Sequence, residues 1–251
     1  MLCLFIAAII PISWWILYRF QSSWNLPVSS NHRCLLVIAH PDDETMFFAP
    51  TIRRLLKANV NIFILSISCG NADGLGTIRK RELGAAVQKL GVTSDNLTIL
   101  DFQDYPDGNV KWEIEKLSRI ILHYLEQIDC NLAITFDSGG ISGHPNHISC
   151  FHALQYLYTN GLLPTDLQVF VLETVTILRK YSSLFDLIPS FFRSTFLNIS
   201  SPSDALSIYS AMREHRSQLV WFRYLYMAFS RYIFINTLKR IPLHRYYTKS
   251  K

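Results

Sequence analysis

Charged residues are scarce in this sequence: they make up 17% of its 251 residues, whereas hydrophobic residues make up 49%. The composition excludes a disordered chain, because disordered chains combine low hydrophobicity with a high density of charge. It is also apolar for a soluble enzyme, so we expect part of the chain to contact a membrane. The net charge is +5, but no dense stripe of Lys and Arg runs through the body, and we therefore expect no nucleic-acid partner.

Paired cysteine motifs are also absent, since none of the five cysteines belongs to a C-x-x-C pair. The cysteines are Cys3, Cys34, Cys69, Cys130 and Cys150. An odd number without paired spacing is typical of reduced thiols in a cytosolic protein, and we expect small apolar core residues rather than disulfides. Two glycosylation tripeptides, at Asn96 and Asn198, would require the lumenal side of a membrane, but so short a motif also occurs by chance.

No charged side chain precedes Arg19, and the run of 17 residues that ends at Tyr18 is almost entirely apolar. As a helix this run would span roughly 26 Å, close to the ~27 Å core of an endoplasmic reticulum bilayer. A cleaved signal peptide is the alternative, but it needs a basic start and a small-residue cleavage site, and this chain has Trp14 and Trp15 there. We therefore predict a transmembrane anchor over residues 1–20.

The orientation of this anchor follows from the charges behind it. Arg19 and Arg33 are the first charged residues, and no acidic residue precedes Asp42. Positive flanks stay on the cytoplasmic side of a membrane, which predicts a single-pass protein with a lumenal N-terminus. We expect residues 21–33 to form a linker and residues 34–251 to form one catalytic domain on the cytoplasmic side.

Short β-rich runs alternate with amphipathic helical patterns along the body. The predicted strands are 34–39, 61–68, 96–100, 131–136 and 167–173, and the predicted helices between them are 45–58, 77–90, 112–128 and 146–160. Strands that alternate with helices form βαβ units, so we predict an α/β fold with a Rossmann-like, mainly parallel sheet flanked by helices. The runs at 34–39 and 131–136 are continuously apolar, as expected of central strands covered on both faces.

Each of the first four predicted strands is followed by a polar loop. The loops read HPDDE, CGNADGLG, DFQDYPDGN and DSGGISGHPNH in chain order. Because ligands of open parallel sheets bind beyond the carboxyl ends of the strands, we expect the four loops to meet at one site. Asp104 and Asp137 in these loops are candidates for binding sugar hydroxyls.

The C-terminal pattern is less regular, because aromatic and basic residues alternate over residues 219–240. Arg223, Arg231, Lys239 and Arg240 interrupt the apolar residues too often for a spanning helix. A basic and aromatic helix that lies among lipid headgroups would tolerate these charges. A C-terminal helix packed on the sheet is equally consistent with the pattern.

Two pairs of residues with metal-ligand chemistry stand at the ends of predicted strands. His40 and Asp43 are three positions apart, and so are His144 and His147. Two imidazole nitrogens and one carboxylate oxygen form the ligand set of a catalytic zinc, whose fourth position takes water. A helix N-cap would explain one acidic residue of HPDDE, but three acidic residues and a histidine exceed that need.

The motifs AHPDDE, GTIRKREL (76–83) and GHPNH resemble those of the PIG-L/LmbE-like family of zinc-dependent N-acetylglucosamine de-N-acetylases. Within that family, residues 34–240 look most similar to the membrane-anchored N-acetylglucosaminyl-phosphatidylinositol de-N-acetylases. The resemblance implies an LmbE-like catalytic domain, bound Zn²⁺ or another divalent cation, a glycolipid substrate and a place in the endoplasmic reticulum membrane. The implied reaction removes the N-acetyl group to give glucosaminyl-phosphatidylinositol, in the second step of glycosylphosphatidylinositol-anchor biosynthesis.

The same resemblance implies a role for each residue of the site. It makes His40, Asp43 and His147 the metal ligands, Asp42 the general base, and His144 the group that steadies the oxyanion or protonates the leaving amine. These roles suit an amide, which is a poor electrophile and needs a metal to polarise it and to lower the pKa of water toward ~7. A protonated His144 would offset the charge on the tetrahedral oxygen. Many relatives have Asp where this chain has Asn146, but an amide can still accept a hydrogen bond from a ligand imidazole.

Arg79 lies in the GTIRKREL motif, three positions before Glu82 on a predicted helix. That spacing favours a surface ion pair between the two side chains. The family motif implies instead that Arg79 lies near the substrate and reaches the inositol phosphate, and both interpretations stay open. His123 and His152 fall inside helical patterns, where we expect ordinary helix-face residues.

Two other functions remain open at the level of the sequence. Clustered carboxylates with a basic residue also suit Mg²⁺ and phosphoryl transfer, which would make the protein a metal-dependent phosphohydrolase. The second alternative is a non-catalytic, membrane-bound sugar-binding subunit that kept the fold. Two histidines in the set favour zinc over magnesium, and the intact HPDD and HPNH motifs argue against lost chemistry.

Overall fold

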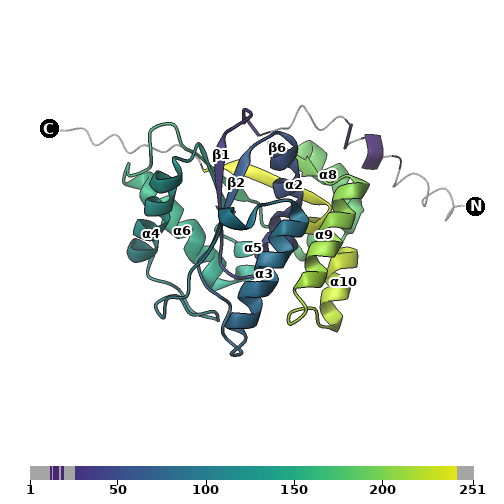
Figure 1. Ribbon diagram of the computed structural model, residues 1–251. Coiled ribbons are helices and arrows are strands. Elements are labelled where there is room, and N and C mark those ends of the chain that lie inside the picture. The colour runs from purple at the N-terminus through teal and green to yellow at the C-terminus, as the bar shows by residue number, and fades with distance from the viewer. Residues whose placement is uncertain (1–11, 13, 17, 20–25, 242–251) are drawn as a thin grey trace, which may run out of the picture.

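The structure, a computed structural model, describes residue 12 and residues 14–16, 18–19 and 26–241. A seven-stranded sheet lies at its centre, in the order β3-β2-β1-β4-β5-β7-β6, with helices on both faces (Figure 1). Strands β3, β2, β1, β4 and β5 are parallel to one another, whereas β7 runs antiparallel to both β5 and β6. The sheet thus has a parallel part and an antiparallel end.

The elements follow one another in a βα alternation as far as β5. The strands are β1 (Arg33–Ile38), β2 (Asn61–Ser66), β3 (Leu97–Ile99), β4 (Leu132–Phe136), β5 (Gln168–Leu172), β6 (Phe196–Ile199) and β7 (Ile235–Arg240). The α-helices are α2 (Ala49–Lys57), α3 (Gly76–Leu90), α4 (Ile114–Ile128), α5 (Gly140–Gly143), α6 (Pro145–Thr159), α7 (Ile177–Lys180), α8 (Leu187–Arg193), α9 (Pro202–Glu214) and α10 (Trp221–Phe229). A π-helical turn, η2 (Glu44–Phe48), leads into α2, and short 3₁₀ turns η3 (Ser94–Asn96), η4 (Ser183–Asp186) and η5 (Arg231–Ile233) complete the set.

Two helical layers cover the sheet (Figure 1). On one face α4 packs against α6, and both contact β1, while α6 also contacts β4. On the other face α3 packs against α9, and α2 lies against β2, β6 and β7. Both faces are therefore closed to water, which is why β1 and β4 are buried along almost their whole length.

The predicted α/β fold with a mainly parallel, helix-flanked sheet is confirmed. All five predicted strands and all four predicted helices are present within two residues of their predicted bounds, apart from the π-helical start of the first helix. The two continuously apolar runs are β1 and β4, which lie side by side in the middle of the sheet.

The prediction of one C-terminal helix over residues 219–240 is wrong. Helix α10 ends at Phe229, Ser230 caps the η5 turn, and the chain continues as strand β7 between β5 and β6. Arg231, which the sequence suggested to be a surface cation, is fully buried in the structure and pairs with the buried Asp186 at 2.9 Å. The sequence interpretation failed here because it placed all the basic residues of this stretch on the surface, whereas Arg231 is neutralised inside the protein.

The predicted membrane anchor over residues 1–20 lies mostly outside the described residues. Within the part of the chain that the structure describes, no helix has the length and hydrophobicity needed to cross a bilayer. Trp14, one of the described residues of the segment, contacts the body: its indole donates to the Ser200 carbonyl at 2.7 Å and meets the Phe234 ring edge-on. Most of the predicted linker, 21–33, is described from Leu26 onward and leads into β1.

The described cysteines are all free and buried, as predicted for reduced core thiols. They are Cys34, Cys69, Cys130 and Cys150. Burial raises the pKa of the Cys34 and Cys150 thiols, so these side chains stay protonated and unreactive at neutral pH. Of the two glycosylation tripeptides, Asn198 is fully buried in β6 and its amide donates to the Thr51 hydroxyl, which leaves it inaccessible in the folded chain.

Candidate metal centre and active site

A cavity of about 820 Å³ opens beyond the carboxyl ends of the parallel strands. Residues from the loops after β1, β2, β3 and β4 line it, as the sequence predicted, and α7 and α10 close it from the other side. The polar lining residues are His40, Asp42, Asp43, Asp73, Arg79, Asp107, Ser142, His144, His147, Lys180, Gln218 and Arg223. The predicted meeting point of the polar loops is therefore a real cavity.

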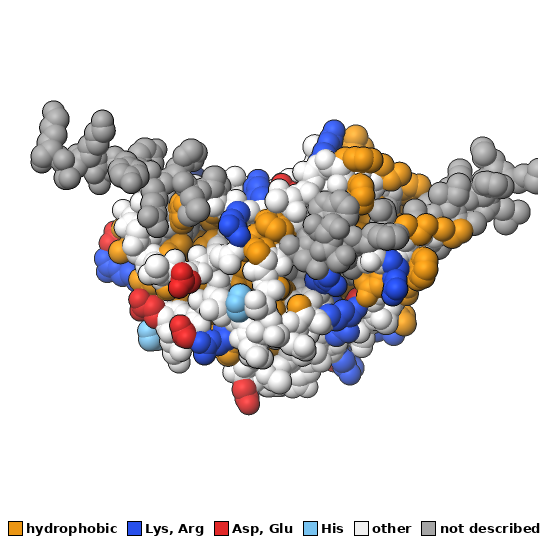
Figure 2. Space-filling view, turned by 90° about the horizontal axis from the view of Figure 1, so that it is seen from above, with side chains coloured by type: hydrophobic (Ala, Val, Ile, Leu, Met, Phe, Trp, Pro, Cys, Tyr) orange, Lys and Arg blue, Asp and Glu red, His pale blue; other side chains and the backbone are white. Residues whose placement is uncertain are grey.

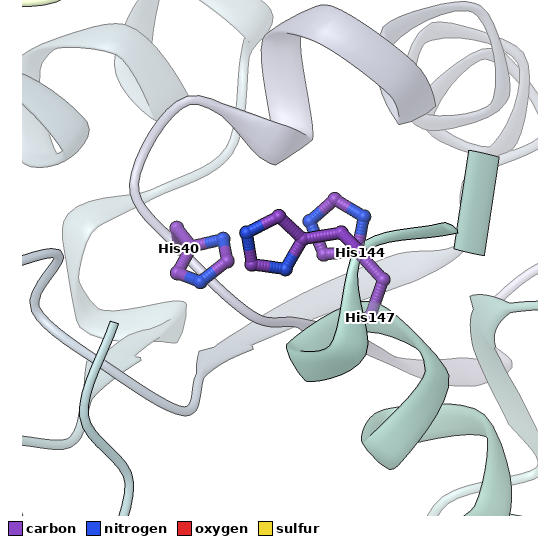
Figure 3. Close-up of side chains that lie close together, drawn as sticks. All are labelled: His40, His144 and His147. Atoms are coloured by element: carbon purple, nitrogen blue, oxygen red, sulfur yellow. The ribbon is translucent and has the colours of Figure 1, made fainter. Parts of the chain in front are cut away.

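Three histidines converge in this cavity: His40 from the loop after β1, His144 from the end of the β4 loop and His147 from the first turn of α6 (Figure 3). Each ring contributes one nitrogen to a set of three that all lie within 4.8 Å of one another. The centroid of the His144 ring lies 4.9 Å from that of His40 and 4.7 Å from that of His147. A single cation can therefore reach nitrogen donors from two loops far apart in the sequence.

Asp43 joins the two sides of the histidine cluster through its carboxylate. One oxygen, Oδ1, lies 3.2 Å from Nε2 of His147, and the other, Oδ2, lies 3.7 Å from Nδ1 of His40. Oδ2 also accepts the backbone N–H groups of Ala39 and His40, at 3.0 and 2.8 Å. Despite its burial, the positive charges of His147 and His40 hold the pKa of Asp43 well below its usual range. The carboxylate is thus ionised and leaves Oδ1 open toward His147.

The position of His147 is fixed by the GISG turn and by strand β4. Its ring stacks on Phe136 at a centroid distance of 4.0 Å, and Nδ1 lies 3.1 Å from the carbonyl of Gly140. A carbonyl only accepts, so Nδ1 carries a proton, and when the ring is neutral its lone pair is on Nε2. That Nε2 is buried without a hydrogen-bond partner among the described residues and faces Asp43. Burial lowers the pKa of His147, but the Asp43 carboxylate outweighs it and leaves the pKa raised, so the site favours a positive charge here.

His40 is oriented by acceptors on its other nitrogen. Nε2 lies 2.8 Å from the Asn146 side-chain oxygen and 3.1 Å from an Asp107 carboxylate oxygen. Both partners accept, so Nε2 is protonated and Nδ1 presents its lone pair toward Asp43. Asn146 therefore does what the sequence led us to expect of an amide at this position, and Asp107 adds the negative charge that the amide lacks.

His144 differs from the other two histidines in its tautomer. It is the N-cap of α6, and its Nδ1 accepts the backbone N–H of Asn146 at 3.3 Å. A neutral ring that accepts at Nδ1 carries its proton on Nε2, where it can donate to an oxygen in the cavity. Burial, followed by the positive charges of His147 and His40, lowers the pKa of His144 to about 4. This lowered pKa favours a neutral ring at neutral pH, whereas the sequence interpretation assumed a protonated His144.

Asp42 has an unusual backbone conformation, with a φ of 117°. Its N–H donates to the Glu44 carboxylate at 3.1 Å, while one carboxylate oxygen lies 3.1 Å from Arg223 and the other 3.9 Å from Arg79. Burial raises the pKa of Asp42, and the Asp43 charge adds to this, although Arg223 and Arg79 oppose it. Such strain and such a raised pKa are typical of a residue that exchanges a proton.

Glu44, the third acidic residue of HPDDE, does not enter the cavity. Its side chain and that of His215 are both fully buried, 2.7 Å apart, and Thr45 donates to the same carboxylate oxygen of Glu44. Burial lowers the pKa of His215, but Glu44 and then Asp42 raise it, so the net shift is upward. Glu44 thus connects the backbone of Asp42 to the end of α9, across 171 residues of sequence.

Arg79 lies in the cavity wall and not on the helix surface. Its Nη1 donates to the Gly70 carbonyl and to Asp107, each at 2.9 Å, and its Nη2 donates to the Pro41 carbonyl at 2.7 Å. Glu82 instead accepts from the backbone and hydroxyl of Ser217. The interpretation of an Arg79–Glu82 ion pair is therefore wrong: one residue supports the site and the other holds the loop that leads into α10.

Gly70 is required by this arrangement. Its φ is +70°, and a Cβ atom placed on it would lie 2.4 Å from the Arg79 guanidinium carbon. Only glycine tolerates both the backbone conformation and the close approach of the side chain.

Two of the predicted sugar-binding residues lie elsewhere. Asp137 does not line the cavity, and its carboxylate accepts from the Thr174 backbone and hydroxyl and from Gly139, which ties the β4 loop to the end of β5. Asp104 borders a separate surface depression with Lys116 and Arg119. His123 and His152 are exposed on their helices, as predicted.

Three residues of the site were not identified from the sequence: Asp107, His215 and Arg223. Asp107 follows Pro106 in the same loop as Asp104, and the Pro-Asp-Gly turn was the available signal for it. His215 and Arg223 had no signal, because they reach Glu44 and the cavity, respectively, from a region whose pattern did not predict its place in the fold.

Comparisons with known proteins agree on one family. Residues 35–157 match the family model described as "PIG-L: GlcNAc-PI de-N-acetylase". A Bos taurus protein named N-acetylglucosaminyl-phosphatidylinositol de-N-acetylase is 43% identical over 208 residues, which cover 82% of each chain. A Schizosaccharomyces pombe protein named as a probable enzyme of the same kind is 40% identical over 215 residues, covering 82% of this chain and 86% of that one.

Solved structures support the same fold. N,N'-diacetylchitobiose deacetylase from Pyrococcus horikoshii superposes with a TM-score of 0.63 and 17% identity, over 92% of this chain and 94% of that one. A deacetylase of the teicoplanin biosynthetic pathway gives a TM-score of 0.56 at 16% identity, over 83% and 98% of the two chains. At these identities the likeness is one of fold.

Proposed function

This chain belongs to the PIG-L family of de-N-acetylases, and from that premise we propose that it removes the acetyl group from N-acetylglucosaminyl-phosphatidylinositol. The products are acetate and glucosaminyl-phosphatidylinositol, in the second step of glycosylphosphatidylinositol-anchor biosynthesis. The observation that carries the proposal is the pair of lone-pair nitrogens, Nδ1 of His40 and Nε2 of His147, which face the two oxygens of the ionised Asp43.

The donor set fits one divalent cation, which we assign as zinc. Two imidazole nitrogens and one carboxylate oxygen are the ligands that a catalytic zinc takes from a protein. The orphaned Nε2 of His147, buried beside a carboxylate, is the observation that favours a resident cation over a simple hydrogen-bond network. When bound at His40, Asp43 and His147, the cation would polarise the acetamide carbonyl and acidify a water molecule.

Asp42 is the proposed general base. Its raised pKa brings it closer to that of an acidified water, so that the proton can move in either direction. Arg223 lies 3.1 Å from one carboxylate oxygen and Arg79 lies 3.9 Å from the other, and the two positive charges favour a carboxylate that stays in the cavity. Asp42 takes a proton as water adds to the carbonyl carbon, and it returns that proton to the departing glucosamine nitrogen.

His144 is the proposed donor to the oxyanion. The neutral ring points its Nε2–H into the cavity, because Nδ1 is occupied by the start of α6. A neutral donor stabilises the developing negative charge without placing a further positive charge beside the proposed cation. In this mechanism His144 is therefore a hydrogen-bond donor and not a third histidine ligand.

The substrate phosphate has a different candidate partner from the one the sequence suggested. The guanidinium of Arg79 already serves two backbone carbonyls and Asp107. Lys180, on the far wall of the cavity, pairs with no acidic side chain in the described part of the chain, and burial and Arg223 lower its pKa. We assign the inositol phosphate to Lys180, where an anion would relieve that unfavourable environment.

The proposed location is the endoplasmic reticulum membrane, with the catalytic domain on the cytoplasmic side. The free, buried cysteines of the described residues support that side, because the cytoplasm keeps thiols reduced. The apolar segment over residues 1–20 is the proposed anchor.

Release of acetate tests the proposal directly. Purified full-length protein is incubated with N-acetylglucosaminyl-phosphatidylinositol, then with a chelator, and then with added Zn²⁺ or other divalent cations. We expect acetate release that stops with the chelator and returns with the metal. Release of inorganic phosphate from the same substrate would favour the phosphohydrolase alternative, and binding without turnover would favour a sugar-binding subunit.

A further inference from the structure

An extended apolar surface lies on α7, η4, α8 and α10, and we call it the rim surface. Its most exposed apolar side chains are Leu178 (83%), Phe192 (79%), Trp221 (74%), Ile177 (72%), Ile188 (65%) and Phe185 (63%). A soluble monomer rarely leaves so many large apolar side chains in water next to one another, and such surfaces mark contact sites. Figure 2 shows hydrophobic side chains gathered along one side of the molecule, with Lys and Arg side chains beside them.

The rim surface reaches the mouth of the active-site cavity. The rings of Tyr181, directly after α7, and Tyr226, on α10, meet edge-on at a centroid distance of 6.3 Å. Lys180 and Tyr181 line the cavity on one side of its mouth, and Trp221 and Phe229 line it on the other. A membrane or a partner molecule that covers the rim surface therefore also faces the entrance of the cavity.

The charges of the rim surface are of one sign. Residues 215–240 contain no acidic residue, and residues 174–195 contain only Asp186, which is buried between Arg179 and Arg231. Exposed cations such as Arg193 remain. By contrast, the exposed face of α4 mixes both signs, as in the Arg119–Glu115 and Lys116–Glu113 pairs.

A lipid surface matches this combination better than a protein partner does. Exposed Trp and Phe side chains enter the boundary between headgroups and acyl chains, and lysine and arginine remain at the level of the anionic headgroups. The Trp14 contact with Ser200 brings the described end of the predicted anchor onto the body directly after β6, and Figure 1 places it on the same side of the molecule as α8. Ile12 and Trp15 are themselves exposed there.

We propose that the rim surface inserts into the bilayer that holds the substrate, so that the cavity opens directly onto the lipid headgroups. This inference rests on the proposed function, which supplies the glycolipid substrate. It adds that the bilayer itself covers the mouth of the cavity. The acyl chains of the substrate then stay in the membrane while the N-acetylglucosamine reaches His147 and Asp42. The enzyme therefore has a second membrane contact besides an N-terminal anchor.

Quenching by brominated lipids measures this contact without reference to turnover. Full-length protein with Cys3→Ser is reconstituted in phosphatidylcholine vesicles containing phosphatidylinositol, with a bimane label on Leu178→Cys or, separately, on Phe192→Cys. Arg119→Cys, on the exposed face of α4, is the matched control. We expect acyl-chain bromination to lower bimane emission about twofold at 178 and 192 and not at 119.

Equal emission at all three positions with and without bromine would overturn the proposal. Self-quenching at 178 in the absence of lipid would also overturn it, because it would show that a second copy of the chain covers the surface. Native cysteines do not interfere with the labels, since those in the described residues are buried.

Activity supplies a second measurement. The double variant Leu178→Ser/Phe192→Ser should lose about tenfold in kcat/KM on long-chain substrate in vesicles, from the lost transfer of two large apolar side chains. It should keep wild-type activity on the water-soluble headgroup without acyl chains. Leu162→Ser, at an exposed apolar position after α6 that is not part of the rim surface, is the control. A wild-type enzyme that hydrolyses neither substrate would refute the proposed function, while the quenching result would still decide the membrane contact.

Discussion

The parallel part of the sheet and its antiparallel end contribute different things to the same cavity. His40, Asp43 and His147 lie directly beyond β1 and β4 and are oriented by nearby backbone groups and by Asn146. Asp42 is instead held by Arg223, which is 181 positions away and follows α9. The metal-binding groups thus lie on the turns that follow β1 and β4, with Asn146 and Asp107 of neighbouring loops orienting His40, whereas the proposed base depends on the packing of the C-terminal region. Substitutions in the two regions should have separable effects.

The largest expected effect is in the parallel part. His147→Ala removes one of the two proposed nitrogen ligands and should lower acetate release by a factor of about a thousand or more, with loss of bound metal. Activity and metal content by mass spectrometry measure the two consequences. His152→Ala, on the same helix but exposed, should change neither. Metal retained at wild-type stoichiometry in His147→Ala would contradict the assignment.

Asp42→Asn should separate catalysis from metal binding. The amide keeps the size of the side chain but accepts no proton, so kcat should fall by about a hundredfold to ten-thousandfold. Metal content should stay at the wild-type level, because Asp42 is not among the proposed ligands. If Asp42→Asn keeps most of its turnover, another group transfers the proton.

The buried Glu44–His215 pair links the two parts of the molecule. His215→Phe leaves the Glu44 carboxylate buried without its partner, which should lower the free energy of unfolding by about 3–5 kcal/mol. Thermal unfolding measures the loss, and adding Glu44→Gln should recover part of it. Because the pKa of His215 is raised in the folded protein, the stability from this pair is complete below the unfolded pKa of 6.5 and is lost as the pH rises through the folded value. If the contribution of the pair to the free energy of unfolding instead increases with pH, His215 is not the positively charged partner of Glu44.

Arg223→Met tests the contribution of the C-terminal region to the base. Arg223 lowers the pKa of Asp42, so its removal should raise that pKa and shift the acidic limb of the kcat/KM profile to higher pH. We expect a loss of about tenfold at neutral pH, in line with one charge-assisted hydrogen bond. Arg216→Met, an exposed residue of the same segment, serves as the control. An unmoved acidic limb would mean that the two groups do not interact in solution.

Gly84→Ala should have the smallest effect and the opposite sign. Gly84 lies inside α3, and a Cβ atom there would meet nothing within 4 Å. Alanine should therefore raise the free energy of unfolding by about 0.5–1 kcal/mol through helix propensity alone. Denaturant unfolding measures the gain, and acetate release should be unchanged. A loss of stability would show that α3 needs the glycine for packing against α9.

The parallel part could be predicted from the sequence because its signals are local. Continuous apolar runs identified β1 and β4, and the polar loops that follow them carry His40, Asp43 and His147, which the structure brings together in one cavity. Asp42 and Arg79 also lie where the sequence led us to expect functional residues. In these cases each residue is within a few positions of the strand or helix that places it.

The antiparallel end could not be predicted in the same way. Arg231 is a cation in an aromatic stretch, and nothing in the sequence indicates that Asp186 neutralises it inside the core. The same is true of Glu44, whose partner His215 is distant in the sequence, and of Asp137, whose carboxylate accepts from Thr174. These outcomes depend on tertiary contacts that no local pattern reports.

Because Arg79 packs closely on Gly70, a substitution at either position affects the other residue. Any side chain at 70 would have to displace the guanidinium, and with it the hydrogen bonds to Pro41 and Asp107. A shorter residue at 79 would remove the obstacle but would leave Asp107 free to turn away from His40. Position 70 should therefore accept only glycine, and position 79 should not accept a shorter residue, even when the two positions are varied together.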